Sequence, residues 1–583
     1  MSDPTIPALR ARLAAGATPA VELRAAGERI RAWNDPALFI HLSDDGVQRG
    51  ADSGPLAGVA LAVKDNIDVA GMPTTAGCPE FAYTPTADAT VVARLRAAGA
   101  VPVGKTNLDQ FATGLVGVRS PHGVPRNPWD AALIPGGSSS GSACAVAAGL
   151  VPAALGTDTA GSGRVPAACT SIVGLKPTKG WLSTTGVVPA VRSLDCVSVF
   201  AHTVSDAWQV TTLAAGFDAS DPFSRRRPET ALPQGALRIG IPTDDELVGV
   251  VDEVLLIAYR AALAGLTSLG HRLVPIDYSP FREAAELLYD GAWVAERTTA
   301  VGDFLAGAPA GADATVAGIF RGGHHHSALA AWRGTYRLAH LARAAEAQWL
   351  RTDVLCLPTI VTHPTVAAVR ADPLGLNSRL GRFTNFANLL DTCALAIPAG
   401  LTPAGSPAGV TLFAPAWHDG LLARIGHELQ LRLDAPLGAT GLRPSQIAIV
   451  PPVIDDGAIA VALFGAHLSG QPLNPRLVAL GGRLAGAIRT APEYRCVLLP
   501  GTPARPGLVR VADHGASFAG ELWRLPAAGV GRLLSEISAP LGLGTIRLDD
   551  GRCVAGFLCE ALGAAGQRDI TTSGSWRDFL AGR

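Results

Sequence analysis

Two short segments rich in glycine and serine hold the residues of this sequence best suited to chemistry. Residues 136–142 read GGSSSGS, and residues 157–164 read TDTAGSGR, after a run of small residues and a short apolar stretch. Because glycine has no Cβ, such loops let backbone N–H groups and serine hydroxyls approach a ligand closely. Two loops joined by one helix and one strand can face the same pocket, where one supplies a nucleophilic serine and the other a hydroxyl that works with it.

A serine nucleophile needs a base that loses its proton near neutral pH, and arginine cannot do this because its pKa exceeds about 12. Only four of the 48 basic residues are lysines, and they lie on either side of the serine loops. They are Lys64, Lys105, Lys176 and Lys179. Lys64 follows the apolar run 58–63 (GVALAV), which is typical of a buried strand, and strand ends commonly carry catalytic groups in α/β folds. The residues alone leave open that Lys64 is a surface lysine.

These residues resemble the amidase signature family, whose pattern is Gly-Gly-Ser-Ser followed by Gly-Thr-Asp-x-Gly-Gly-Ser-x-Arg. Both motifs are present in the two loops, with Ala160 where glycine is usual. The resemblance implies a hydrolase with a Ser-Ser-Lys catalytic set. In this set Ser162 is the nucleophile, Ser138 the bridging serine and Lys64 the base.

Amide hydrolysis requires a nucleophile, a proton carrier and a group that stabilises the tetrahedral oxyanion. For the oxyanion hole, the resemblance implies the backbone N–H groups of Thr159, Ala160, Gly161 and Ser162. It also implies a cis peptide bond between Gly137 and Ser138, whereas Asp158 and Arg164 are expected to stabilise the loop. A free lysine has a pKa of about 10.4, so a base that acts near pH 7 must be depressed by about three units through burial.

The segment 288–297 (LYDGAWVAER) resembles the segment by which allophanate hydrolases hold the carboxylate of their substrate. The resemblance implies that Tyr289 and Arg297 bind the substrate and that Gly114 lines the same site. A guanidinium suits this role because it meets a carboxylate with two parallel hydrogen bonds. From the residues alone, a helical tyrosine and arginine eight positions apart are ordinary surface residues.

The C-terminal part of the chain supports the same interpretation. Residues 464–474 (FGAHLSGQPLN), with 497–501 and 518–525, are similar to the appended domain of allophanate hydrolases, which resembles the γ-glutamyl cyclotransferase fold. The resemblance implies that this domain assists the decarboxylation of N-carboxycarbamate. His467 is the candidate residue there, although a lone histidine is as readily structural.

Several elements must position these residues. Apolar runs at 239–241, 354–357, 394–397 and 409–412 predict strands between amphipathic helices, which indicates an α/β domain with its sheet covered on both faces. By resemblance this is the amidase signature fold with a mixed central sheet. A chain of 583 residues is too long for one core. We predict an amidase signature domain over 1–440, a proline- and glycine-rich linker over 441–455, and a small α+β barrel-like domain over 456–583.

Composition excludes several classes of protein. A net charge of −1 offers no basic surface for nucleic acid or anionic membranes, and no apolar run approaches the roughly 20 residues of a membrane helix. The N-terminus has no apolar core typical of a signal peptide, and the nine cysteines form no C-x-x-C pair, so we expect reduced thiols and a cytoplasmic protein.

No cofactor or metal is expected. Residues 99–106 (GAVPVGKT) fit the phosphate-binding loop pattern by letter, but they follow a predicted helix and form an apolar run with a proline. Three adjacent histidines at 324–326 cannot easily converge on one ion and are interpreted as a loop.

The function that the resemblance implies is hydrolysis of allophanate to ammonia and carbon dioxide, in two steps carried out by the two domains. The resemblance also suggests a homodimer. Three alternatives stay open: a general amidase acting on another small carboxylated amide, the amidase component of a tRNA-dependent amidotransferase, and a non-catalytic interaction protein.

Overall fold

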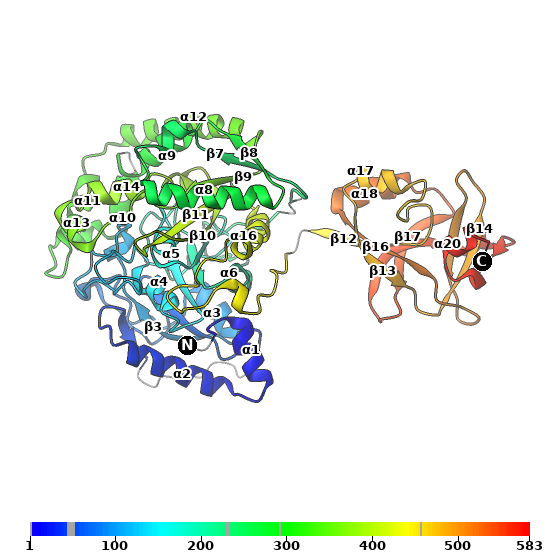
Figure 1. The fold of residues 1–583 in the computed structure, drawn as a ribbon, viewed down its shortest axis with the longest axis horizontal. Coiled ribbons are helices and arrows are strands. Elements are labelled where there is room, and N and C mark those ends of the chain that lie inside the picture. Colours follow the sequence, from blue (N-terminus) through cyan, green and yellow to red (C-terminus); the bar gives the residue numbers. More distant parts are fainter. Residues whose placement is uncertain are drawn as a thin grey trace. The chain divides into compact units, whose positions relative to one another are not determined.

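The computed structural model describes residues 3–43, 53–228, 230, 232–290, 293–454 and 457–582. These residues form two compact units, of which the first ends at Ile454 and the second contains residues 457–582 (Figure 1). Each unit has its own buried apolar core. The carbonyls of Val450 and Val453, in the stretch predicted as a linker, accept hydrogen bonds from Ser205 and Trp208 of the first unit. The domain boundaries themselves stay a prediction.

The first unit is built on one mixed sheet. In its described residues the strand order is β1-β3-β2-β4-β6-β5-β10-β11-β9-β7-β8. The strands are β1 (Phe39–Leu42), β2 (Ala60–Lys64), β3 (Val101–Thr106), β4 (Ala153–Thr157), β5 (Val173–Lys176), β6 (Val197–Ala201), β7 (Arg238–Ile241), β8 (Arg272–Pro275), β9 (Val354–Pro358), β10 (Thr392–Leu401) and β11 (Pro407–Pro415). The four strands predicted after residue 230 lie within β7, β9, β10 and β11 and are confirmed.

Helices cover both faces of this sheet, as the fold prediction requires. In β2, Ala60 and Ala62 belong to one apolar cluster, whereas Leu61 and Val63 belong to another, because successive side chains of a strand point to opposite faces. Both faces are buried, so β2 and β4 do not alternate between apolar and polar residues and are apolar up to their last residues, Lys64 and Thr157.

The helices of the first unit connect and cover these strands (Figure 1). They are α1 (Ile6–Ala14), α2 (Pro19–Trp33), α3 (Thr90–Ala97), α4 (Ser140–Ala147), α5 (Val165–Thr170), α6 (Val204–Ala214), α7 (Asp244–Leu247), α8 (Glu253–Ser268), α9 (Ser279–Asp290), α10 (Trp293–Ala306), α11 (Ala314–Gly323), α12 (Ala328–Trp349), α13 (Val366–Ala371), α14 (Gly375–Leu380), α15 (Phe386–Leu389) and α16 (Asp419–Leu433). Threonine side chains cap several of them, such as Thr18 before α2 and Thr203 before α6.

Parallel pairing of β2 and β4 brings the two predicted catalytic segments together. Val63 lies opposite Leu155 in the register, so the carboxyl ends of both strands meet at one edge of the sheet. Lys64 and Thr157 are the last residues of the two strands. The sheet therefore places the lysine beside the turn that follows β4.

The second unit has an α+β fold. Its described strands form one sheet in the order β13-β16-β12-β18-β17 and another in the order β15-β14-β19. These strands are β12 (Ala458–Leu463), β13 (Arg483–Arg489), β14 (Tyr494–Leu499), β15 (Arg505–Arg510), β16 (Ala519–Pro526), β17 (Leu541–Arg547), β18 (Cys553–Cys559) and β19 (Arg568–Asp569). The helices are α17 (Asn474–Ala479), α18 (Ala527–Glu536), α19 (Ala561–Ala564) and α20 (Trp576–Leu580). No helix in the described parts of either unit is long and apolar enough to cross a membrane.

Candidate active site

Lys64 is buried and contacts two hydroxyl groups. Its amine donates hydrogen bonds to Oγ of Ser138 and to Oγ1 of Thr157, each at 2.7 Å. Burial disfavours the charged amine and lowers the pKa of Lys64 to about 7, although three buried aspartates act in the opposite direction. A large share of this amine is therefore unprotonated at neutral pH, as a general base requires.

The loop that carries Ser138 passes close to a buried carboxylate. The peptide bond between Gly137 and Ser138 is cis, in agreement with the prediction. A Cβ on Gly137 would lie 2.1 Å from Oδ2 of Asp109, so this close approach requires glycine. Asp109 also accepts hydrogen bonds from three backbone N–H groups within residues 116–119. Asp109 thus orders two loops that border the Lys64 amine.

Ser162 lies in the turn between β4 and α5, and its side chain is buried. Its hydroxyl donates a hydrogen bond to the carbonyl of Gly114 at 3.4 Å. Among the described residues, no hydrogen bond joins Ser162 directly to Ser138. The structure therefore brings Lys64 and Ser138 into contact. Ser162, in the turn that follows Thr157, lies against Gly114.

The backbone of this turn has donors without acceptors. The N–H groups of Thr159, Ala160, Gly161 and Ser162 make no hydrogen bond within the described part of the chain. Backbone donors in a buried segment are normally paired, so four successive unpaired N–H groups are suited to bind an oxyanion. Gly161 has a φ of 153°, and a Cβ there would lie 2.5 Å from Oγ1 of Thr384. Ala160 does not have a positive φ, so alanine fits in place of the usual glycine.

A buried ion pair holds the same turn in shape. Arg164 donates from Nε and Nη2 to the two carboxylate oxygens of Asp158, at 2.9 Å each. Burial alone would raise the pKa of Asp158, but Arg164, together with Lys176 and the N–H of Gly163, lowers it below its usual value. The amide of Asn388 donates to the carbonyls of Asp158 and Thr159. These contacts agree with the expected stabilising role of Asp158 and Arg164.

Arg297 and Tyr289 lie on consecutive helices, α10 and α9. The guanidinium of Arg297 lies 5.7 Å from the centroid of the Tyr289 ring, and the arginine is only 1% exposed. Its Nη1 donates to Oγ1 of Thr113 at 2.8 Å, whereas its Nε has no partner. Within the described residues no carboxylate pairs with Arg297. The charge of Arg297 also acts on the buried Asp195, but the two form no ion pair. Because a buried charge without a directly paired carboxylate is costly, this arginine indicates a site for a negatively charged ligand.

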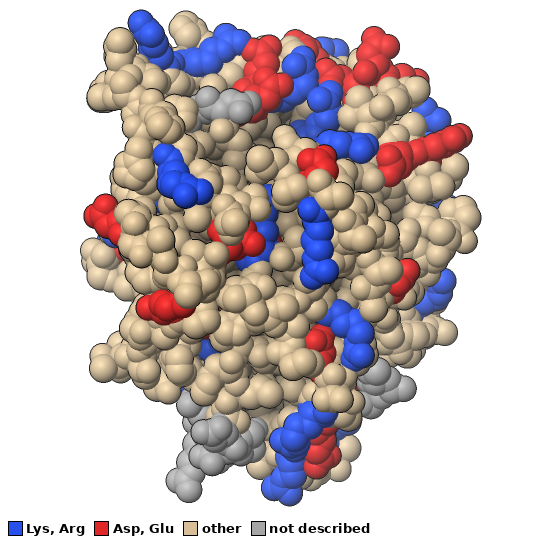
Figure 2. Space-filling model, turned by 90° about the vertical axis from the view of Figure 1, so that its left-hand side faces the viewer, with Lys and Arg blue, Asp and Glu red and all other residues tan. Residues whose placement is uncertain are grey.

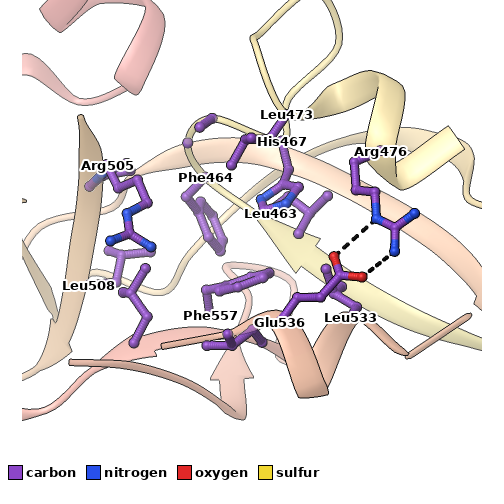
Figure 3. Close-up of a pocket in the computed structure, with 15 residues that line it drawn as sticks. Leu463, Phe464, His467, Leu473, Arg476, Arg505, Leu508, Leu533, Glu536 and Phe557 are labelled. Atoms are coloured by element: carbon purple, nitrogen blue, oxygen red, sulfur yellow. Dashed lines mark hydrogen bonds and ion pairs between the residues drawn. The ribbon is translucent and has the colours of Figure 1, made fainter. Parts of the chain in front are cut away.

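A separate cavity of about 210 Å³ lies beside His467 in the second unit (Figure 3). The imidazole stacks on Phe557 with ring centroids 5.4 Å apart, and burial lowers the pKa of His467. Most of the wall is apolar. The apolar side chains labelled in Figure 3 are Leu463, Phe464, Leu473, Leu508, Leu533 and Phe557.

Two arginines line this cavity, and they differ in whether a carboxylate pairs with them. Arg476 pairs with Glu536 through two hydrogen bonds. Arg505 lines the opposite side in the view of Figure 3 and is half-buried. In the part of the chain that the structure describes, the Arg505 side chain has neither an ion pair nor a hydrogen bond. The cavity therefore combines one imidazole, one unpaired guanidinium and an apolar wall.

Sequence reasoning missed Thr157, Thr113 and Arg505. Thr157 belongs to the second serine motif and Thr113 precedes Gly114, so their positions beside predicted residues could have drawn attention to them. Arg505 has no such signal, because it lies 38 positions after His467 on a strand of the other sheet, and only the packing of the two sheets brings it to the cavity.

The two patterns rejected from the sequence have structural explanations. Residues 101–106 form β3 directly after α3, and Lys105 within this strand pairs with Asp65 at 3.2 Å, both fully buried. The lysine of the apparent phosphate-binding pattern is therefore committed to an internal ion pair. The histidine run follows α11, where His324 is the C-terminal cap of the helix. Among the described residues, no group of three His, Cys, Asp or Glu side chains is placed to hold a metal ion.

Comparison with known proteins agrees with this geometry. The amidase family model matches residues 41–423, and the model of the allophanate hydrolase C-terminal domain matches residues 459–581. A urea amidolyase of Lachancea kluyveri is 41% identical over 545 residues, which are 90% of this chain and 30% of that protein. The chain thus spans about a third of the length of the curated urea amidolyases that it matches.

Two further matches extend over nearly the whole length of the matched protein. A glutamyl-tRNA(Gln) amidotransferase component from Ralstonia nicotianae is 34% identical over 495 residues, 74% of this chain and 98% of that protein. The crystal structure of Kluyveromyces lactis allophanate hydrolase superposes with a TM-score of 0.84 at 36% identity and covers 99% of both chains. The chain belongs to the amidase family and carries an allophanate hydrolase C-terminal domain after its amidase domain.

Proposed function

We propose that the chain is an allophanate hydrolase. The first unit would hydrolyse the terminal amide of allophanate and release ammonia, and the second would assist decarboxylation of the product, N-carboxycarbamate. The observation that carries this proposal is Arg297, a buried guanidinium without a carboxylate partner, linked through Thr113 to the loop beside Ser162. The similarity to Kluyveromyces lactis allophanate hydrolase over both units supports it.

In the first unit, the proposed reaction begins with attack of Ser162 Oγ on the carbonyl carbon of the terminal amide. The proton of Ser162 passes through Ser138 to the neutral amine of Lys64, which lies 2.7 Å from Ser138 Oγ. The oxyanion that forms binds the unpaired N–H groups of residues 159–162. Lys64 then returns the proton through Ser138 to the departing nitrogen, the C–N bond breaks, and ammonia leaves.

The acyl-enzyme that remains is hydrolysed by water. Lys64 accepts a proton from the attacking water through Ser138, and the carbonyl carbon again becomes tetrahedral. When the ester bond breaks, the proton returns to Ser162 Oγ and N-carboxycarbamate leaves. A pKa of about 7 suits Lys64 for both directions of transfer, because the amine must accept and release a proton at the same pH.

Arg297 and Tyr289 would hold the substrate's carboxylate during these steps. The guanidinium can donate two parallel hydrogen bonds to one carboxylate, and its burial strengthens that pairing. A neutral amide leaves Arg297 buried and without an anion, so it binds less well. This asymmetry would give the enzyme its preference for short carboxylated amides.

In the second unit, we propose that Arg505 holds one carboxylate of N-carboxycarbamate and that His467 supplies a proton to its nitrogen. The proton donor is the imidazolium form, which burial disfavours but a bound dicarboxylate favours. The C–N bond to the other carboxylate breaks, its electron pair stays on the nitrogen, which takes the proton, and carbon dioxide leaves with carbamate as the second product. The apolar wall around Phe464 and Phe557 supports this step, because a poorly solvated carboxylate is less stable and leaves more readily as neutral carbon dioxide.

The amidotransferase relatives raise the alternative of a protein that works on tRNA. Their similarity covers 74% of this chain, whereas the match at 459–581 is to a C-terminal domain named for allophanate hydrolase. On the face seen in Figure 2, basic and acidic side chains are interspersed rather than separated by sign. This face therefore offers no basic surface for a nucleic acid.

We also propose a homodimer in the cytoplasm. Helix α12 exposes Leu329, Trp332 and Tyr336 at one side, each more than half exposed, which supports a contact with another protein surface. The nine cysteines are all free thiols, which supports a reducing compartment.

The proposal is tested by measuring ammonia release from allophanate, biuret, malonamate and the neutral amide propionamide. We expect Arg297→Ala to raise KM for allophanate and malonamate by about 10- to 100-fold, because a hydrogen-bonded charge contributes about 1.5–3 kcal/mol. The same variant should leave propionamide hydrolysis nearly unchanged. Arg343→Ala, which removes an exposed arginine on α12, is the matched control. Equal turnover of malonamate and propionamide by the unmodified enzyme would contradict the proposal.

A further inference from the structure

Thr113 is a fully buried residue whose hydroxyl joins Arg297 to the loop beside Ser162. Nη1 of Arg297 donates to Thr113 Oγ1 at 2.8 Å, and this hydroxyl in turn donates to the carbonyl of Phe111 at 3.1 Å. Because its proton is directed to Phe111, the hydroxyl presents its lone pairs to Arg297. The next residue, Gly114, accepts the hydrogen bond from Ser162. Two hydrogen bonds and the peptide bond between Thr113 and Gly114 therefore connect the guanidinium with the predicted nucleophile.

The loop that carries Thr113 has a defined and unusual shape. Phe111 and Ala112 have φ values of 50° and 52°, in the left-handed region that residues other than glycine rarely adopt. The Phe111 ring packs edge-on against Phe304 of α10, with centroids 6.0 Å apart, and against Phe320 of α11 at 6.3 Å. Helix α10 is thus held to this loop at two points, one apolar and one through Arg297.

Apart from the Tyr289 ring, 5.7 Å from its guanidinium, Arg297 has few other contacts that could fix its direction. Its Nε is buried and unpartnered, and in the described residues its side chain makes no hydrogen bond except the one to Thr113. An arginine side chain has many rotamers, so a single well-oriented acceptor decides where the guanidinium points. The same acceptor belongs to the loop against which Ser162 lies.

We propose that Thr113 is a positioning residue that fixes Arg297 relative to Ser162 and thereby sets the preference of the first unit for short carboxylated amides. The inference rests on the proposed function. Without the hydroxyl, Arg297 still carries its charge but no longer holds the substrate's carboxylate at a fixed place relative to the attacking oxygen. Binding of carboxylated amides then weakens, while the Ser-Ser-Lys set keeps its contacts.

The test compares malonamate with propionamide, which differ in that a carboxylate replaces a methyl group. In Thr113→Val, which keeps the shape and removes the hydroxyl, we expect KM for malonamate to rise about 10-fold with kcat within a factor of about two. The kinetics with propionamide should not change. Thr113→Ser should keep the low malonamate KM of the unmodified enzyme, because serine retains the hydroxyl.

A matched control lies on α10 itself. Thr298 follows Arg297, is also buried, and its hydroxyl donates to the carbonyls of Val294 and Phe320 rather than to Arg297. Thr298→Val therefore removes a comparable buried hydroxyl without touching the guanidinium, and its ratio of malonamate to propionamide kcat/KM should match the unmodified enzyme.

Four outcomes would overturn the inference. An unchanged malonamate KM in Thr113→Val would show that Arg297 does not depend on the hydroxyl. An equal loss of kcat/KM with malonamate and propionamide in Thr113→Val would assign Thr113 a purely structural role. A raised malonamate KM in Thr113→Ser would do the same. If the unmodified enzyme itself does not prefer malonamate, the proposed function fails and the inference fails with it.

Discussion

At the scale of single residues, the proposed chemistry depends on one amine that can lose its proton near neutral pH. Lys64 is buried beside Ser138 and Thr157, and desolvation lowers its pKa although aspartates lie nearby. Arginine, which this chain uses at 44 of its 48 basic positions, could not serve here because it does not lose its proton. The site therefore needs a lysine, and the burial of its amine brings the pKa into the range where it can act as a base.

The first prediction concerns pH. Because the neutral form of Lys64 is the base and its pKa is about 7, kcat/KM for malonamate should be level above pH 7 and fall about tenfold per unit below it. The substrate carboxylate stays ionised throughout this range. Initial rates between about pH 5.5 and pH 8.5 measure the profile, and a flat profile down to pH 5.5 would contradict a lysine base with this pKa.

Residue types and spacing predicted much of the candidate site, but not its contacts. The two serine motifs and Lys64 were predicted, and the structure places Lys64 against Ser138 although 74 positions separate them. The roles of these residues stay predictions until they are measured. Thr157 was not predicted as a partner of Lys64, because its hydroxyl reaches the amine only through the pairing of β2 with β4.

At the scale of elements, the turn after β4 carries the N–H groups proposed as the oxyanion hole. Its four free N–H groups are held between the Asp158–Arg164 ion pair and the Asn388 amide. The run of small residues between the two serine loops forms α4, which begins at Ser140, inside the first loop, and ends at Ala147. Every residue of α4 is buried, and such a helix of small residues lies close to the sheet, so packing rather than propensity sets its ends.

The second prediction concerns this turn. In Gly161→Ala the added Cβ would lie 2.5 Å from Oγ1 of Thr384 at a φ of 153°, so the turn must shift and its N–H groups lose their alignment. We expect kcat for malonamate to fall by about 10²- to 10³-fold, the usual effect of losing an oxyanion donor. Gly318→Ala in α11 is the control, because a Cβ there meets open space. Unchanged kcat in Gly161→Ala would exclude an oxyanion hole at this turn.

At the scale of the whole molecule, two units with separate cores carry two candidate sites. The α/β class, the covered sheet and the resemblance to allophanate hydrolases were predictable, because apolar strands and motifs are local signals. The set of residues that lines the cavity beside His467 was not predictable. It comes from β12, β15, α18 and β18, which lie far apart in the sequence.

The third prediction separates the two units by their products. In Arg505→Ala, ammonia release from allophanate should precede carbon dioxide release, because the proposed decarboxylation loses its carboxylate anchor and slows by about 10- to 100-fold. Arg510→Ala removes an arginine at the other end of β15 that pairs with Glu493, and its products should appear together. If carbon dioxide keeps pace with ammonia in Arg505→Ala, the cavity beside His467 does not perform the second step.

The central claim is that Ser162 becomes acylated, and it is tested most directly by mass spectrometry of the enzyme quenched during turnover of allophanate. We predict a covalent adduct on the peptide that contains Ser162, and neither an adduct nor ammonia release above background in Ser162→Ala. An adduct on a different residue, or a Ser162→Ala enzyme that releases ammonia at the unmodified rate, would contradict the account.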